Sequence, residues 1–313
     1  MFALRNAHSR LGARKAVLLS GLAALSGCAI SPLATRTASF STAATAAIAQ
    51  TNNAYQLVNQ EYASAQAATL ADTFNAATFD ANAFQPFLPA KGLAVRTKIL
   101  NGLAQYATLL AEVSGNQPIT DLQTQVTATG AALKSLQTDD FTSFKIDPTE
   151  QNAAQAAVVA FGRALIERAR SRALPGILDE MNPYVQKICT VLETDIGTEG
   201  NPGLASELHQ AYDTEIRDQV YFIRHNGASM SAEERRTEIE LLPALVLKQQ
   251  QADATLAATR KALAALAAAH AALVDTKKQK SAPAFRLEMT KLVENAQAIG
   301  GYYNSLSNPS PAK

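Results

Sequence analysis

A few side chains combine the chemical type and the spacing that a metal or catalytic site needs. His209 and Asp213 stand four residues apart, so a helix would place an imidazole and a carboxylate on one face. A zinc site takes three or four protein ligands, however, and this pair supplies only two of them. The remaining histidines belong to no metal-binding spacing. The sequence therefore predicts no metal site and no bound cofactor.

Cys189 is the other reactive group, since a thiolate can act as a nucleophile. It lies in YVQKICTVLE, where Val185, Cys189 and Leu192 recur at spacings of four and three. This spacing indicates one face of a helix and a small buried side chain, and no histidine or other base stands near it in sequence. The chain also has no nucleophile elbow, no phosphate-binding glycine loop and no histidine-glutamate helix motif. We therefore expect no enzymatic activity.

Residues 262–274, ALAALAAAHAALV, form a nearly unbroken apolar run. Runs of about ten to fourteen apolar residues are typical of buried helices, whereas a membrane span needs about 20. His270 within the run could sense pH, but a histidine at the edge of a helical seam is the commoner case. The run predicts a buried helix with His270 at its edge.

Phenylalanines are concentrated in two predicted loops, TFDANAFQPFLPAKG and TDDFTSFKIDP. The residues are Phe79, Phe84, Phe87, Phe141 and Phe144. Aromatic side chains in loops either cover the open end of a helical bundle or form a recognition surface. Both interpretations stay open, and the five phenylalanines are the candidate interaction surface of the chain.

The first residues have the layout of a secretory signal peptide. A positive segment carries Arg5, Arg10, Arg14 and Lys15 and no acidic residue, and an apolar segment of ten residues, 16–25, follows it. Ten residues are too few for a bilayer core, which needs about 20. A charged start, a short apolar middle and small residues at the end predict a signal peptide over residues 1–27.

The end of this segment, Leu25-Ser26-Gly27-Cys28, resembles the lipobox of bacterial lipoproteins. The resemblance implies cleavage between Gly27 and Cys28, lipid transfer to the Cys28 sulfur, and acylation of the new amino terminus with a fatty acid such as palmitate. Ala29 stands where an inner-membrane retention signal would have aspartate, which favours the inner leaflet of the outer membrane, facing the periplasm. The alternative is an ordinary cleaved signal with a chance cysteine.

Removal of the signal peptide changes the charge and the cysteine count. The whole chain has 28 basic and 27 acidic residues; residues 1–27 hold four basic and no acidic ones, which leaves 24 against 27, a net charge of −3. Nucleic-acid binding needs a basic face, so we exclude it. With Cys28 lipidated, Cys189 is the one remaining cysteine, and no intramolecular disulfide can form.

The rest of the chain is rich in alanine and follows helical periodicity. Apolar residues recur at spacings of three and four in eight segments: 37–76, 91–114, 122–136, 154–165, 177–196, 204–223, 231–278 and 283–306. The seven-residue repeat in 231–278 is long enough for coiled-coil-like packing, and 37–76 could lie along it. The sequence predicts an all-α fold, an elongated antiparallel helical bundle of about eight helices. We expect residues 28–36 as a lipidated tether, 37–308 as the bundle and 309–313 as a disordered tail.

Two functional hypotheses follow from these features. The first is a lipid-anchored helical scaffold of the cell envelope, held to the membrane through Cys28 and bound to an envelope protein partner. The second is a small-molecule or lipid-binding module whose bundle encloses a pocket. Tyr55, Tyr62 and Tyr106 are the candidate lining residues for the second hypothesis.

Overall fold

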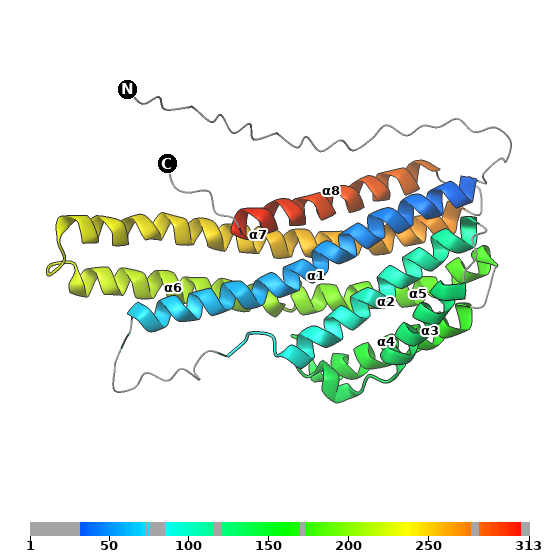
Figure 1. The fold of residues 1–313 in the computed structure, drawn as a ribbon, viewed down its shortest axis with the longest axis horizontal. Helices are drawn as coiled ribbons and strands as arrows, with labels where there is room; N and C mark the ends of the chain where they lie inside the picture. The colour runs from blue at the N-terminus through cyan, green and yellow to red at the C-terminus, as the bar shows by residue number, and fades with distance from the viewer. Residues whose placement is uncertain are drawn as a thin grey trace, which may run out of the picture. The chain divides into compact units, whose positions relative to one another are not determined.

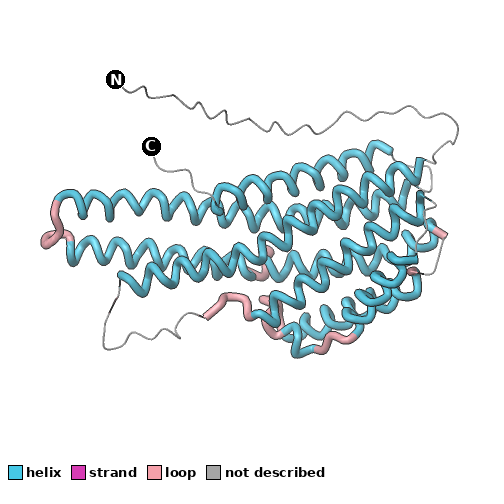
Figure 2. The backbone as a smooth tube through the Cα atoms, in the orientation of Figure 1, coloured by secondary structure: helices cyan, strands magenta, loops and turns pink. Residues whose placement is uncertain are grey.

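A computed structural model describes residues 32–72, 74, 85–115, 120–169, 173–276 and 282–307 (Figures 1 and 2). These residues form eight α-helices and the 3-10 helix η2 (Thr138–Phe141). The α-helices are α1 (Pro32–Asp72), α2 (Ala90–Gly115), α3 (Thr120–Lys134), α4 (Pro148–Arg168), α5 (Leu174–Ile196), α6 (Gly203–Asn226), α7 (Ala232–Thr276) and α8 (Ala282–Ser307). The described residues contain no strand, only an isolated bridge between Thr198 and Asn201. The prediction of an all-α fold is confirmed.

Helix ends follow local capping rules. The Asp147 side chain accepts a hydrogen bond from the Thr149 backbone N–H at 2.8 Å, and Pro148 occupies the first position of α4, where its missing N–H costs nothing. At the start of α7, the Glu234 backbone N–H donates to Ser231 Oγ, and the Ser231 N–H donates to the Glu234 carboxylate. This reciprocal pair is a capping box, which stabilises the predicted start of the helix.

Helix α7 is the longest element and contacts four others. Its 45 residues extend about 68 Å at 1.5 Å per residue. It packs against α8, α1, α5 and α6, and its bounds lie close to the predicted 231–278. The expected packing of the first long helix along it is confirmed by the contacts between α1 and α7.

Helices α5 and α6 follow each other end to end along α7, both antiparallel to it (Figure 1). Hydrogen bonds to α7 mark this course. Gln186 Nε2 on α5 donates to the Ala267 carbonyl, whereas Gln219 Nε2 on α6 donates to the Glu238 carbonyl. The partner number on α7 falls as the residue number rises, so α7 serves as a common support for the two shorter helices.

The junction between α5 and α6 needs glycine at two positions. Gly197 has φ 136° and Gly203 has φ 56°, both in the region that favours glycine. A Cβ on Gly203 would also lie 2.6 Å from the Gly197 nitrogen. Asn201 secures the turn, because its Nδ2 donates to the Lys145 carbonyl at 2.6 Å. The turn therefore keeps α6 in the direction of α5 instead of folding it back.

Helix α1 begins five residues before the expected start of the bundle. It starts at Pro32, and Ala34 and Thr37 are already buried. Residues 32–36 of the expected tether therefore belong to the bundle. The rest of that tether, the signal peptide and the tail 309–313 lie outside the described residues.

Candidate functional site

Several residues singled out in the sequence cannot be placed. Gly27 and Cys28, the expected cleavage and lipidation positions, lie outside the described residues, as do Phe79 and Phe84. The lipid anchor and this part of the candidate interaction surface therefore stay predictions.

The other three phenylalanines do not form an exposed recognition surface. Phe141 and Phe144 are buried, 5.0 Å apart between ring centroids, and Phe144 packs on the guanidinium of Arg96. Phe87 is half-buried against Tyr62. The prediction of a recognition surface is wrong for Phe141 and Phe144, because their loop folds inward over a buried charge.

That charge belongs to an ion pair at the centre of the bundle, which the sequence analysis missed. Arg96 on α2 and Asp195 at the end of α5 are both fully buried and form two hydrogen bonds, Nε to Oδ2 at 2.8 Å and Nη2 to Oδ1 at 2.7 Å. The other guanidinium hydrogens go to the Gly92 carbonyl and to Ser143 Oγ and carbonyl oxygen. All five donors of the arginine are thus used.

The aspartate is equally well satisfied. Its Oδ1 also accepts from the Lys145 backbone N–H at 2.8 Å, and its Oδ2 accepts from the Tyr55 hydroxyl at 3.2 Å. Burial disfavours the charged guanidinium, but the Asp195 carboxylate more than offsets this, and the pKa of Arg96 is raised. Both groups are closed to solvent and fully hydrogen-bonded, so the pair has a structural role. It joins α1, α2, α5 and the Ser143–Lys145 loop.

His270 forms a second buried polar centre. It is fully buried, not at the edge of a seam as predicted, because Phe40 of α1, Tyr106 of α2 and Asn182 of α5 surround its ring. Its Nδ1 lies 2.9 Å from Asn182 Oδ1, which can only accept, so Nδ1 carries the proton. Nε2 then accepts from the Tyr106 hydroxyl at 2.8 Å. Burial lowers the pKa of His270 to about 3, so the side chain is neutral.

Cys189 is a buried free thiol, as the helical spacing indicated. Burial raises the pKa of the thiol, which keeps it protonated. A protonated thiol is a poor nucleophile. Its environment agrees with a small side chain in the core of α5.

His209 and Asp213 are brought together with a third residue, Asp253 of α7. His209 Nδ1 lies 2.9 Å from the Asp253 carboxylate, and Nε2 lies 3.6 Å from that of Asp213. All three side chains are about half exposed. Across the described ranges, no group of three or more histidine, cysteine, aspartate or glutamate residues is placed to hold a metal ion. The arrangement links α6 to α7 at the surface through the hydrogen bond between His209 and Asp253.

The apolar run 262–274 lies within α7, and most of its residues are buried. None of the described helices combines the length and the apolar character required to cross a bilayer.

Helices α6 and α7 project beyond the ends of α1 and α8 (Figure 1). Of the nine exposed large apolar residues among the described residues, five lie within residues 216–248 of these two helices, and the others are Phe74, Leu287, Val293 and Tyr302. We call residues 216–248 the α6–α7 arm. Within it only Gln219 and Gly227 are buried. Five large apolar residues of the arm are 39–56% exposed: Tyr221, Ile239, Leu241, Val246 and Leu247.

The two helices of the arm are linked by polar groups. Gln219 Nε2 donates to the Glu238 carboxylate at 2.9 Å as well as to its backbone carbonyl, and Arg235 Nη1 donates to the Gly227 carbonyl at 2.9 Å. Ile239 and Val246 are seven residues apart and share one flank of α7. The arm therefore keeps its shape through hydrogen bonds and leaves an apolar flank uncovered.

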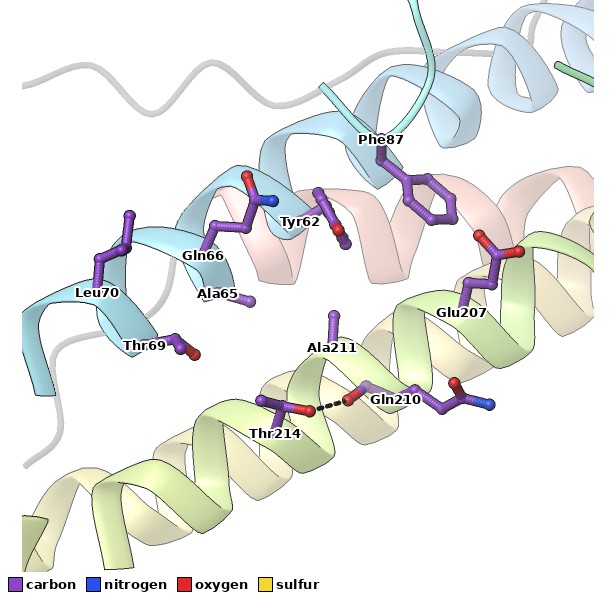
Figure 3. A pocket seen from close by; sticks show the side chains of 10 residues that line it. All are labelled: Tyr62, Ala65, Gln66, Thr69, Leu70, Phe87, Glu207, Gln210, Ala211 and Thr214. Carbon is purple, nitrogen blue, oxygen red and sulfur yellow. Dashed lines mark hydrogen bonds between the residues drawn. The ribbon is translucent and has the colours of Figure 1, made fainter. Parts of the chain in front are cut away.

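A pocket opens at the base of the arm, between α1 and α6 (Figure 3). Its volume is about 480 Å³. The lining residues are Tyr62, Ala65, Gln66, Thr69, Leu70, Phe87, Glu207, Gln210, Ala211 and Thr214. Of the three tyrosines predicted to line a pocket, only Tyr62 does so here, since Tyr55 and Tyr106 are engaged in the two buried polar centres.

Comparison with known proteins gives no relative from which a function could be transferred. No family model matches the chain, and searches of curated proteins and of solved structures found no match either. The functional argument therefore depends on the residues and geometry described above.

Proposed function

We propose that the protein is a lipid-anchored scaffold of the cell envelope that binds a partner protein through the α6–α7 arm. The observation that carries this proposal is the cluster of five exposed large apolar residues on the arm, more than on any other part of the described chain. Uncovered apolar patches on a soluble surface mark interaction sites. The proposal includes no catalytic step.

The proposed anchor is Cys28, at the inner leaflet of the outer membrane. Replacement of Cys28 by Ser should leave an unprocessed precursor, because the sulfur that accepts the lipid is gone. Metabolic labelling with a radioactive fatty acid measures the attached lipid directly, and the Cys28→Ser variant should carry no label. A wild-type protein that carries no label and is freely soluble would show that the anchor is wrong.

The arm can be tested by crosslinking from a defined residue. A photoreactive amino acid in place of Tyr221, 56% exposed on α6, should crosslink to one partner protein in intact cells. The same substitution at Leu287 on α8, 55% exposed, is the matched control and should not. Ile239→Asp and Leu247→Asp should then remove the Tyr221 crosslink at unchanged thermal stability.

Two outcomes contradict the arm as the binding surface. The first is an equal yield of the same crosslinked partner from positions 221 and 287. The second is a crosslink from position 221 that persists in the Ile239→Asp and Leu247→Asp variants.

A further inference from the structure

A second pocket lies beside α7, where α5 ends and α6 begins, and the proposed scaffold function does not use it. Three of the residues that line it, Gly197, Ala205 and Ala257, have little or no side chain, so the space between the helices is not filled. Its volume of about 270 Å³ is close to the lower limit of small-molecule sites, which take roughly 300–1,000 Å³. The pocket therefore suits a small ligand.

Arg260 on α7 gives one end of this pocket a positive charge. Its Nη1 donates to the Gly197 carbonyl at 2.8 Å, and its other N–H groups have no hydrogen-bond partner among the described residues. Glu193 on α5 interacts with Arg260 electrostatically without a contact ion pair, and burial outweighs this interaction and raises the pKa of Glu193. Unlike the fully paired Arg96, Arg260 therefore has donors left for the carboxylate of a ligand.

Asp253 gives the other end of the pocket a negative charge. Its Oδ2 lies 2.9 Å from Nδ1 of His209, and its Oδ1 has no partner in the described part of the chain. Asp213 lies 3.6 Å from the other nitrogen of the same ring. Because two carboxylates share one imidazole, this end has a net negative charge whether or not His209 is protonated.

An apolar surface separates the two charges. Ala257 lies between Asp253 and Arg260 on one face of α7, at spacings of four and three. Leu256 and Ile196, which also line the pocket, are both buried. Seven residues of α-helix extend about 10 Å, so the two charges are held apart along the pocket. A ligand that binds both needs opposite charges at the two ends of an apolar spacer.

We propose that this pocket binds a small zwitterion in which an apolar spacer separates an ammonium group from a carboxylate, as in the ω-amino acids. The carboxylate binds the free N–H groups of Arg260, the ammonium binds Asp253 Oδ1, and the spacer packs on Ala257. Binding is independent of the arm, because the lining residues lie outside 216–248.

Four probes separate the parts of this assignment. 6-Aminohexanoate has both charges and the spacer, hexylamine lacks the carboxylate, hexanoate lacks the ammonium, and glycine lacks the spacer. In an NMR titration we expect 6-aminohexanoate to bind most tightly and glycine not to bind. Hexylamine should bind about 10-fold more weakly, because it leaves the partly buried Arg260 unpaired. Hexanoate should bind about 2- to 5-fold more weakly, because Asp253 is 41% exposed and an exposed ion pair contributes little.

Two variants assign the binding to this pocket. Arg260→Gln should reduce the affinity for 6-aminohexanoate to that for hexylamine and should not weaken hexylamine. Asp253→Asn should reduce it to the affinity for hexanoate and should not weaken hexanoate. Arg236→Gln, at an exposed position of the arm, is the matched control and should leave all four titrations unchanged. If Arg260→Gln does not fold, the half-exposed Asp253→Asn and the four probes decide alone.

The proposal is overturned if 6-aminohexanoate does not bind, or if hexanoate, hexylamine or glycine binds as tightly as it does. Full affinity for 6-aminohexanoate in Asp253→Asn, or in a folded Arg260→Gln protein, also overturns it. The two functions can be tested separately, because Arg260→Gln should retain the crosslink from position 221, and Leu247→Asp should retain 6-aminohexanoate binding.

Discussion

The centre of the bundle and the α6–α7 arm treat polar and apolar side chains in opposite ways. Around Arg96 and Asp195, charged groups are fully buried and every donor of the arginine has a partner. On the arm, apolar side chains such as Tyr221 and Leu247 are about half exposed, and polar groups link the two helices. At the centre, other residues of the chain supply hydrogen-bond partners to the buried charges. On the arm, no described residue fully covers the exposed apolar side chains.

This difference separates stability from binding. A buried charge pair contributes to the fold only as a complete set, because removal of one partner leaves the other charged and desolvated. Exposed apolar residues contribute little to the fold, but they gain free energy when a partner covers them. Substitutions in the two regions should therefore have opposite profiles: loss of stability in the centre, and loss of binding in the arm.

The largest effect is expected from Asp195→Ala. The variant leaves the buried Arg96 guanidinium without its carboxylate, and the free energy of unfolding should fall by about 3–5 kcal/mol. Glu240→Ala is the matched control, since it breaks the exposed Arg236–Glu240 pair of the arm. It should leave stability unchanged. Denaturant unfolding measures both, and an equal loss in the two variants would refute the comparison.

The next effect is a loss of stability in acid that depends on His270. The unfolded pKa of histidine is about 6.5, and in the folded protein it is about 3. Because the unfolded chain binds this proton more readily, the stability contribution is complete above pH 6.5 and is lost as the pH falls toward 3. At pH 5 the loss relative to pH 7 should be about 2 kcal/mol.

His270→Gln should remove this part of the pH dependence, because glutamine does not titrate. His225→Gln, at an exposed position of the arm, is the control and should retain it. Denaturant unfolding at pH 7 and pH 5 distinguishes the three proteins. A wild-type pH dependence in His270→Gln would mean that other groups cause the acid loss.

The helices could be predicted from the sequence because each follows a local repeat. The apolar residues of α7 recur at spacings of three and four, and Ser231 and Glu234 mark its start, so the predicted and observed bounds agree within two residues. The course of α5 and α6 along α7 could not be predicted. It depends on Gly197 and Gly203 in a turn whose direction is set by tertiary contacts.

The polar centres escaped prediction for a different reason. Arg96 and Asp195 are 99 residues apart in sequence, and each interrupts an apolar helix face in a way that resembles a surface residue. His270 stands among alanines, which are compatible with either a seam edge or a core. The pocket could not be predicted from the sequence either, because Ala65 and Ala211 face each other only when α1 and α6 are packed together.

A smaller effect is expected from Cys189→Ala. The thiol is buried in α5, and its loss should reduce the free energy of unfolding by roughly 1 kcal/mol, as a small core deletion does. Because burial raises the pKa of this thiol, partner crosslinking from position 221 should not change. A loss of the crosslink at unchanged stability would assign Cys189 a functional role.

The smallest effect on stability is expected from Leu247→Ala, in the arm. Leu247 is 53% exposed, so truncation of its side chain removes few contacts and should change the free energy of unfolding by no more than about 0.5 kcal/mol. Leu263→Ala on the same helix is the matched control. Leu263 is 1% exposed, and its truncation should cost about 2–5 kcal/mol through loss of packing and creation of a cavity.

The two leucines therefore test the separation of stability from binding with one chemical change. If Leu247→Ala destabilises the protein as much as Leu263→Ala does, the arm is part of the core and its apolar residues need no partner. If Leu247→Ala is neutral for stability but weakens the crosslink from position 221, the same side chain that the fold does not need is required for binding. That combination is what distinguishes a docking surface from an exposed end of a bundle.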